Sequence, residues 1–440
     1  MGDDLVPIPA VAPPDRPAMT RRDLLRAGAL ALIPGSMPLR AADPTPGDLA
    51  PFDNLMTGFL RVAEVPGASL AVARDGRMVY ARGFGRADQD RDEPVGADSL
   101  FRIASLAKPI TSAAVFRLID AGKLRLDDRI FDVLDLGREI PEGKTLDARW
   151  REITIYQLLR HMGGWDRSRS IDPMLRMARR AWESGPDPSH RAWAIIREML
   201  GRPLDDTPGT HYAYSNFGYA LLGRAIERVT GQAYADHVRE AVLAPAGATG
   251  MRLGKTLLAD RAPGEVRYHD GDKTGPASYG PEPRPDVPRP YGVWCLEAMD
   301  SHGGWIASAA DLVRFAVALD RPSQPLVSAE AFRAMTARPG GSAGHTKDGD
   351  PTPVYYGCGW LVRPNARTGR CTMWHSGALN GTSSLLVRRS DGITFAALFN
   401  ARYDAGENEL SRIIDPLVNK AIARIRSWPD GEPLIRVGTS

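Results

Sequence analysis

Cysteine is scarce in this chain of 440 residues, and its few copies do not form a recognisable site. Cys295, Cys358 and Cys371 are too few and too scattered for a disulfide scaffold, and they lack the paired spacing of a zinc site. We expect all three to be buried as small apolar side chains.

An excess of charge of one sign is also absent. The formal net charge is only +3, which gives no strong field, so neither nucleic acid nor an anionic membrane surface is expected as a partner. Charged residues make up 25% of the chain and apolar residues 43%, which is ordinary for a soluble globular enzyme. The length allows two domains, or one large domain with an insertion, and the chain has no internal repeat.

The N-terminal region carries two adjacent arginines and a short apolar run. Residues 20–26 read Thr-Arg-Arg-Asp-Leu-Leu-Arg, residues 27–33 are apolar, and Pro34 and Gly35 close the run. This order is typical of a twin-arginine export signal, and the run is far too short for a permanent membrane span. A surface helix that begins with two arginines is the alternative. We expect residues 1–42 to be an export signal and leader, with Met1 or Met19 as the start, and the mature protein to be periplasmic or extracellular.

Strand patterns occur at both ends of the chain and helical patterns in the middle. Two apolar runs that flank Asp75-Gly76 predict a β-hairpin. Further antiparallel strands are expected at 356–363, 371–375, 383–389 and 393–399. Helices are expected at 48–65, 109–121, 154–161, 172–184, 190–200, 216–230, 233–241 and 407–425, the last one broken or kinked at Pro416.

This order of patterns predicts an α/β fold in which both termini build one antiparallel sheet and a helical region is inserted between them. We expect an α/β domain formed by residues 45–135 and 300–440. Residues 136–299 form the helical subdomain, whose segment 262–290 is rich in proline and glycine and is expected to be a long loop. Long loops in compact enzymes often form the rims of active sites.

Ser105 and Lys108 form the first chemically suggestive pair. Pro109 is tolerated only in the first turn of a helix, so a helix should open at or just before Ser105 and end near Gly122. Residues i and i+3 share a helix face, which places the lysine amine beside the serine hydroxyl at a helix N-terminus that favours an oxyanion. A serine hydroxyl needs a neighbour to take its proton, so the pair predicts a nucleophile and its base. A serine cap with a first-turn lysine is the structural alternative.

Tyr214-Ser215-Asn216 is the second element. It follows the loop residues Pro208-Gly209 and leads into a helix near Asn216, so Tyr214 should project from a turn and Asn216 should be the N-cap. A tyrosine with a pKa of about 10 is a poor base at neutral pH unless a lysine ammonium stabilises the phenolate or shares the proton. The alternative is a tyrosine that packs in a loop beside a capping asparagine.

His375-Ser376-Gly377-Ala378 is the third element. As an edge strand it offers a polar side chain, a small residue, a glycine for close approach and an Ala378 N–H that points into a cleft. That N–H could complete an oxyanion hole. A strand-end histidine without a chemical role is the alternative.

Together and in this order, the three elements resemble the family of class C β-lactamases, D-alanyl-D-alanine carboxypeptidases and related esterases. The resemblance extends over about residues 50–425. It implies an α/β sandwich and a helical subdomain with the site between them, and neither a metal nor an organic cofactor. Lys273-Thr274-Gly275 has the letters of the third motif in many β-lactamases, but no strand pattern flanks it, so we assign it no catalytic role.

The resemblance also implies a role for each residue. Ser105 would be the nucleophile, and Lys108 and Tyr214 the pair that handles the proton. Asn216 would be a hydrogen-bond partner of the bound acyl group. The backbone N–H groups of Ser105 and Ala378 would hold the oxyanion.

Two departures from the family pattern bear on the substrate. His375-Ser376-Gly377 replaces Lys-Thr-Gly, so a titrating imidazole that contacts the substrate or Tyr214 stands where many members have a fixed cation. This favours the carboxypeptidase and esterase branches over an efficient β-lactamase. Residues 158–164 read Leu-Leu-Arg-His-Met-Gly-Gly in place of a Leu-Leu-x-His-Thr-Ser-Gly landmark, and we interpret His161 as structural.

The leading hypothesis is therefore a serine hydrolase that cleaves an ester or amide of a small-molecule or peptide substrate through an acyl-enzyme on Ser105. The alternative from another class is a non-catalytic, or slowly turning over, binder of peptidoglycan fragments or other acyl ligands. A third hypothesis is acyl transfer to an acceptor other than water. The sequence does not determine the oligomeric state.

Overall fold

A computed structural model describes residues 47–434 with the exception of residues 281 and 283. The expected export signal lies outside the described residues. Among the described helices, each is either too short or too polar to cross a membrane.

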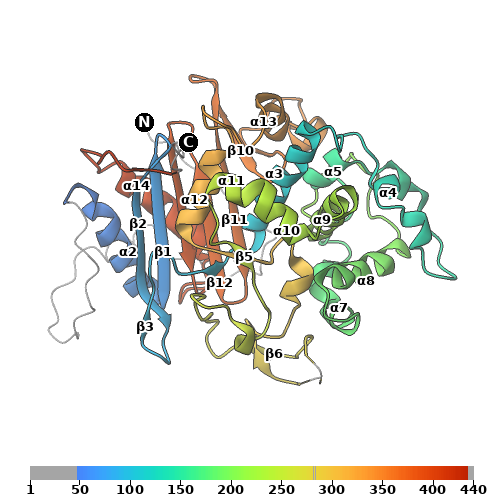
Figure 1. Cartoon of the computed structure of the whole chain (residues 1–440), viewed down its shortest axis with the longest axis horizontal. Helices are drawn as coiled ribbons and strands as arrows, with labels where there is room; N and C mark the ends of the chain where they lie inside the picture. Colours follow the sequence, from blue (N-terminus) through green and yellow to red (C-terminus); the bar gives the residue numbers. More distant parts are fainter. Residues whose placement is uncertain (1–46, 281, 283, 435–440) are drawn as a thin grey trace.

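A large antiparallel sheet, built from both ends of the chain, forms one side of the molecule (Figure 1). Its spatial order is β14-β2-β1-β13-β12-β11-β10-β9, with β3 paired to β2. The N-terminal and C-terminal parts meet where β1 pairs with β13. The strands are β1 (Gly67–Arg74), β2 (Arg77–Asp88), β3 (Glu93–Pro94), β9 (Tyr355–Tyr356), β10 (Leu361–Asn365), β11 (Arg370–Leu379), β12 (Thr382–Arg388), β13 (Ile393–Phe399) and β14 (Glu432–Pro433).

The hairpin of β1 and β2 forms as predicted. Asp75 and Gly76, with φ of 48° and 76°, are the two residues between the strands. Two successive positive φ angles are typical of the type I′ turn, whose twist matches that of the flanking strands.

Helices cover both faces of the sheet. On one face α2 (Ala50–Ala63) and α14 (Leu410–Ile422) pack against Ala68, Leu70 and Val72 of β1. On the other face α12 (Ala309–Ala318) packs against β1 and β13. Because the centre of the sheet is buried on both sides, β1 and β13 are almost continuously apolar instead of alternating.

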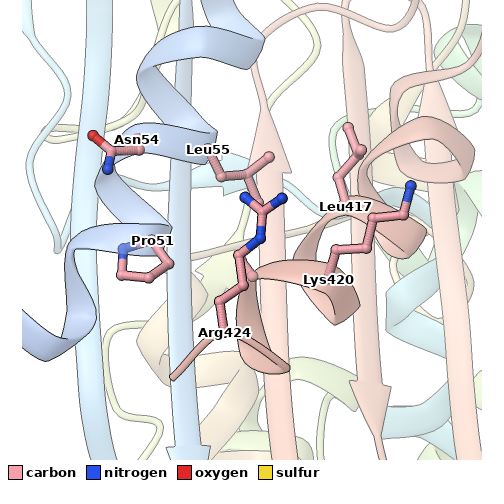
Figure 2. A pocket seen from close by; sticks show the side chains of 7 residues that line it. Pro51, Asn54, Leu55, Leu417, Lys420 and Arg424 are labelled. Atoms are coloured by element: carbon pink, nitrogen blue, oxygen red, sulfur yellow. The ribbon is translucent and has the colours of Figure 1, made fainter. Parts of the chain in front are cut away.

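A shallow surface pocket lies between α2 and α14 (Figure 2). Leu55 and Leu417 give it an apolar side, and Asn54, Lys420 and Arg424 add polar groups. The pocket belongs to the face of the sheet that α2 and α14 cover.

The middle of the chain forms the helical region beside the sheet (Figure 1). Its helices are α3 (Ala107–Asp120), α4 (Ile130–Val133), α5 (Ile155–Leu159), α6 (Pro173–Arg176), α7 (Ala178–Glu183), α8 (Pro188–Leu200), α9 (Asn216–Thr230), α10 (Tyr234–Val238) and α11 (Ala244–Ala246), with α13 (Ala329–Thr336) later in the chain. A π-helical segment, η5 (Arg239–Leu243), joins α10 to α11.

Short elements connect these parts. The 3-10 turns are η1 (Gly47–Leu49), η2 (Ala104–Leu106), η3 (Leu136–Arg138), η4 (Ala148–Glu152), η6 (Leu258–Asp260), η7 (Leu296–Met299) and η8 (Gly341–Ala343). One small sheet pairs β4 (Phe101–Arg102) with β8 (Trp305–Ala307) and β8 with β5 (Arg252–Leu253). Another pairs β6 (Thr274–Gly275) with β7 (Val287–Pro288).

Several local predictions need correction. The helix expected at 172–184 is divided into α6 and α7, because Met177 leaves helical geometry with φ −106° and ψ 26°. The strand expected at 356–363 is divided into β9 and β10. Pro416 does not end α14, whose residues Ile414 and Val418 are fully buried on either side of it. Cys295 and Cys358 are buried, but Cys371 is only partly buried, and all three are free thiols.

Candidate active site

Ser105 lies at the start of α3, as predicted. The 3-10 turn η2 contains Ser105 and runs directly into α3, which ends just before Gly122, a residue with φ 66°. Ala104 has φ 48°, which is uncommon for a residue with a side chain. This sharp turn leaves Ser105 partly exposed, whereas its neighbours in η2 are buried. Such local strain is typical of functional sites.

Two hydroxyl groups of β12 hold the segment before Ser105. Thr382 Oγ1 donates to the carbonyl oxygen of Arg102 over 2.8 Å, and Ser384 Oγ donates to that of Ile103 over 2.8 Å. These two hydrogen bonds connect the segment that precedes Ser105, the predicted nucleophile, to β12 of the central sheet.

Gly377 of β11 touches this same segment. An added Cβ at Gly377 would lie 2.1 Å from the carbonyl oxygen of Ile103 and 3.0 Å from the backbone nitrogen of Ser105. The pairing of β11 with β10 ends at Trp374, so the half of β11 with Gly377 and Ala378 has only β12 as a partner strand. The edge-strand expectation therefore holds for this half, which is the half that approaches Ser105.

Gly377→Ala tests this close approach. The new methyl group would overlap backbone atoms, so we expect a loss of about 1–3 kcal/mol in the free energy of unfolding, together with slower reaction of Ser105. Thermal unfolding and the rate of fluorophosphonate labelling measure the two effects. Gly340→Ala is the matched control, because an added Cβ there has nothing within 4 Å. Equal behaviour of the two variants would contradict the packing argument.

The Lys108 side chain is fully buried and reaches three groups. Its Nζ lies 3.1 Å from Ser105 Oγ, 2.8 Å from Asn216 Oδ1 and 2.9 Å from the carbonyl oxygen of His302. Burial lowers the pKa of Lys108 well below its ordinary value, and this outweighs the opposing field of Asp172. The neutral amine is therefore favoured.

The neighbours of Lys108 orient that amine. Asn216 Oδ1 and the His302 carbonyl oxygen can only accept hydrogen bonds, so they engage the two N–H groups of a neutral amine. In that form the lone pair of the nitrogen is available to accept the Ser105 proton over the 3.1 Å between Nζ and Oγ.

Tyr214 completes the group around Ser105. Its side chain makes a hydrogen bond with the Ser105 side chain, and the centre of its ring lies 4.8 Å from Lys108 Nζ. Burial raises the pKa of Tyr214 above its ordinary value, although the hydrogen bond to Ser105 opposes this shift. The neutral phenol is therefore favoured, and not the lysine-stabilised phenolate that we considered from the sequence.

Asn216 is the first residue of α9 and not its N-cap, which corrects the sequence prediction. Ser215 is the cap, because its Oγ accepts a hydrogen bond from the Gly218 N–H over 3.2 Å. The Asn216 side chain instead bridges two groups, with Oδ1 bound to Lys108 and Nδ2 donating to Asp172 Oδ2 over 2.6 Å. Asp172 thus determines which end of the amide faces the lysine.

His375 lies behind the site and is only 4% exposed. The carbonyl oxygen of Ser376 accepts from Nδ1 over 2.7 Å, so Nε2 accepts from the Tyr356 hydroxyl over 3.0 Å. The His375 and Tyr214 ring centres are 6.3 Å apart. Burial lowers the pKa of His375 to about 3, so this imidazole carries no charge at neutral pH. It lies among buried aromatic rings that include Tyr214, and a contact between His375 and the substrate stays a prediction.

Comparison with known proteins agrees with this arrangement. The family model described as Beta-lactamase matches residues 52–418. The chain belongs to the beta-lactamase family.

Individual relatives span several named activities. The chain is 33% identical over 281 residues to "Penicillin-binding protein 4" of Amycolatopsis lactamdurans, covering 60% of this chain and 61% of that protein. It is 33% identical over 232 residues to "Esterase EstB" of Burkholderia gladioli, covering 50% of this chain and 55% of that protein. The match thus spans less than two thirds of either relative.

A solved structure shares the fold. The octameric penicillin-binding protein homologue from Pyrococcus abyssi superimposes with a TM-score of 0.63 at 23% identity, covering 88% of this chain and 78% of that one. The α/β fold class predicted from the sequence is thereby confirmed.

His161 packs beneath the site, in line with its structural interpretation. Its ring centre lies 4.3 Å from that of Tyr214 and 4.4 Å from that of Tyr356. Its Nδ1 accepts from the Ser215 N–H over 3.2 Å, which helps to position the second motif. Burial lowers the pKa of His161 well below its ordinary value, so it is neutral as well.

Lys273-Thr274-Gly275 takes no part in this group. Thr274 and Gly275 form β6, a two-residue strand where the sequence showed none. Lys273 Nζ lies 3.5 Å from a carboxylate oxygen of Glu407 and also faces the ring of Tyr403. The assignment of the third motif to β11 stays a prediction.

Sequence reasoning did not single out Arg167, Asp172 or His302. His302 acts through its backbone oxygen, for which no residue pattern exists. Asp172 precedes Pro173 and caps α6, a signal that predicts a helix start but not a bond to Asn216. Arg167 occurs in an arginine-rich segment without a distinguishing pattern.

One group of described residues could hold a metal ion. Side-chain atoms of Asp166, Asp206 and His211 lie within 4.8 Å of one another. Arg169 donates to Asp166 Oδ2 over 3.1 Å and also pairs with Asp206, so its guanidinium already neutralises charge there.

Proposed function

We propose that this protein is a serine hydrolase that cleaves an ester or amide through an acyl-enzyme on Ser105. The observation that carries the proposal is the environment of Lys108, a fully buried amine whose Nζ lies 3.1 Å from Ser105 Oγ and within hydrogen-bonding distance of two further acceptors. Catalytic lysines depend on such a lowered pKa, because a base is most effective when its pKa is near the working pH.

The reaction follows from these contacts. Lys108 Nζ accepts the proton of Ser105 as Oγ forms a bond to the substrate carbonyl carbon, and the carbonyl oxygen becomes an oxyanion. The backbone N–H groups of Ser105 and Ala378 are the expected donors to that oxygen. Tyr214 donates its phenolic proton to the leaving oxygen or nitrogen as the bond to carbon breaks, and it regains a proton from the Lys108 ammonium. Water then attacks the acyl-enzyme by the reverse proton path.

The substrate class follows from the relatives and from His375. The named relatives include an esterase, which supports esters as substrates, and a penicillin-binding protein. A neutral, buried His375 leaves β11 without the fixed cation that many family members have in the third motif, so we expect weak β-lactamase activity at most.

Active-site labelling tests the proposal. The full chain is treated with a fluorophosphonate and digested, and we expect a mass adduct on the peptide that contains Ser105. The same protein is assayed with short-chain p-nitrophenyl esters, D-amino-acid amides and a chromogenic cephalosporin, and we expect turnover in the ester or amide group. Absence of both adduct and turnover would contradict the proposal. A stable acyl adduct without turnover would indicate a binder, and product formation that rises with added alcohol or amine would indicate acyl transfer.

We further propose that the protein is exported. Arg21-Arg22 and the apolar residues 27–33 support the twin-arginine route. A fusion of residues 1–45 to a reporter, with Arg21 and Arg22 changed to lysine as the control, tests it through the periplasmic fraction.

A further inference from the structure

Arg167 is a charged residue at the site that the proposed reaction does not use. It lies in the segment between α5 and α6, and its guanidinium carbon is 4.9 Å from the centre of the Tyr214 ring. Its side chain is 44% exposed, so it reaches the solvent side of the buried group around Lys108. Arg167 thus lies beside Tyr214, the side chain that is hydrogen-bonded to Ser105.

The backbone that carries Arg167 is firmly held. The preceding residue, Asp166, donates its N–H to Asp205 Oδ2 over 2.7 Å. Trp165 packs edge-on against Trp150 and Phe217, with ring centres 5.0 and 4.8 Å apart. A recognition group on such an anchored segment needs little ordering when a ligand binds.

The guanidinium of Arg167 is not saturated by the protein. Within residues 47–434, excluding 281 and 283, Arg167 forms an ion pair with Asp172. The distance from Arg167 Nη1 to Asp172 Oδ2 is 3.9 Å, which is too long for a hydrogen bond. The neighbouring Arg169 differs, because it donates to Asp166 and pairs with Asp206. An arginine has five N–H donors in a planar fork that fits a carboxylate, and those of Arg167 are available.

The protonation states of the basic side chains around the site assign its positive charge to Arg167. Burial lowers the pKa of Lys108 and His375, so both favour their neutral forms. His161 is neutral for the same reason. A guanidinium keeps its charge at any ordinary pH, and its field reaches Tyr214 and Asp172. The fixed positive charge of this site therefore lies on the Arg167 side and not on β11.

We propose that Arg167 binds a carboxylate carried by the substrate, so that this enzyme prefers anionic esters or amides over neutral ones of the same shape. The inference rests on the proposed Ser105 hydrolase and specifies its substrate class. The carboxylate can belong to the acyl part or to the leaving group, and the experiment includes an arm for each.

Matched ester pairs test this specificity. The acyl arm compares p-nitrophenyl hydrogen adipate with p-nitrophenyl hexanoate, and the leaving-group arm compares 3-carboxyphenyl butyrate with phenyl butyrate. Rates are corrected with Ser105→Ala. Wild type, Arg167→Gln, Arg167→Lys and the control Arg169→Gln are assayed for kcat and KM. Arg169→Gln removes the same charge from the same segment without a recorded contact to Tyr214.

In at least one arm, we expect Arg167→Gln to lower kcat/KM for the anionic ester by roughly 10- to 100-fold, mainly through KM. The neutral ester of that pair should change by less than about threefold. Arg167→Lys should fall between, because lysine keeps the charge but not the fork. Arg169→Gln should leave the ratio between the two esters unchanged.

Three outcomes would overturn the inference. They are an equal loss for the anionic and neutral esters in Arg167→Gln, the same loss of ratio in Arg169→Gln, and a wild type without preference in either arm. In each of these cases the esters are still hydrolysed, so the Ser105 hydrolase stands. Absence of hydrolysis of every ester together with absence of fluorophosphonate labelling would overturn both.

Discussion

Ser105→Ala lowers the turnover of every accepted ester or amide by roughly 10⁴-fold or more, to the level left by binding and oxyanion stabilisation alone. The physical reason is that Oγ forms the bond to the acyl carbon, and alanine has no atom in its place. The fold should tolerate the change, because Ser105 is partly exposed and the segment before it is held by hydroxyl groups of Thr382 and Ser384 in β12. We expect unchanged circular dichroism and a thermal midpoint within a few degrees of wild type.

Ser112→Ala is the matched control for this prediction. Ser112 lies further along α3, and its Oγ donates to the carbonyl oxygen of Cys358 over 2.8 Å. The variant loses one buried hydrogen bond, which costs about 1 kcal/mol, and it should keep its activity. If Ser105→Ala retained activity similar to that of Ser112→Ala, Ser105 would not be the nucleophile.

Lys108→Met lowers kcat by roughly 10²- to 10⁴-fold, the range expected for loss of a positioned general base. Methionine has a similar length and is at ease in a buried position, but it has no lone pair able to take the Ser105 proton. Two effects on stability oppose each other. Removal of the desolvated amine stabilises the folded state. Loss of the hydrogen-bond donor to Asn216 Oδ1 and to the His302 carbonyl oxygen destabilises it. The measurement is single-turnover acylation together with thermal unfolding, and we expect a large kinetic change with a small shift in the midpoint.

The pH dependence of the activity tests the role of Lys108 as the base. Activity should rise with pH as Lys108 loses its proton, at a pKa below the ordinary value of 10.5. Between that lowered pKa and 10.5 the unfolded state binds the proton and the folded state does not, so the free energy of unfolding rises with pH across this window. Lys108→Met should lose this pH dependence of the free energy of unfolding.

Tyr214→Phe distinguishes the proposed role of Lys108 in proton transfer from that of Tyr214. If Lys108 is the base, the slower acylation of Tyr214→Phe should keep the same rise with pH, because Tyr214 favours its neutral phenol in this site. Absence of that rise in Tyr214→Phe, or a wild-type rate of acylation in Lys108→Met, would indicate that the phenol of Tyr214 is the base and not Lys108.

The sequence was most informative where the relevant geometry is local. Asp75-Gly76 supplies two residues that accept positive φ angles, and the hairpin forms there. Ser105 and Lys108 share a helix face through a spacing of three residues, and their side chains meet at 3.1 Å. Strand patterns near both ends of the chain, with helical patterns between them, predicted one sheet built from both ends.

Local reasoning failed where a distant residue competed for the same group. Asn216 looked like a helix cap, but Ser215 performs that role, so the Asn216 amide is available to Asp172 and Lys108. The partners of the His375 ring, the Tyr356 hydroxyl and the Ser376 carbonyl oxygen, could not be predicted from local sequence either.

The order of motifs along the chain thus determined the family, the fold class and the side chains to examine. The tertiary structure decided their protonation and their partners, since burial shifts a pKa and burial depends on packing between distant segments. Lys108 favours a neutral amine because α9 and the segment around His302 enclose it. Arg167 is exposed, and no carboxylate of the described chain comes within hydrogen-bonding distance of its guanidinium.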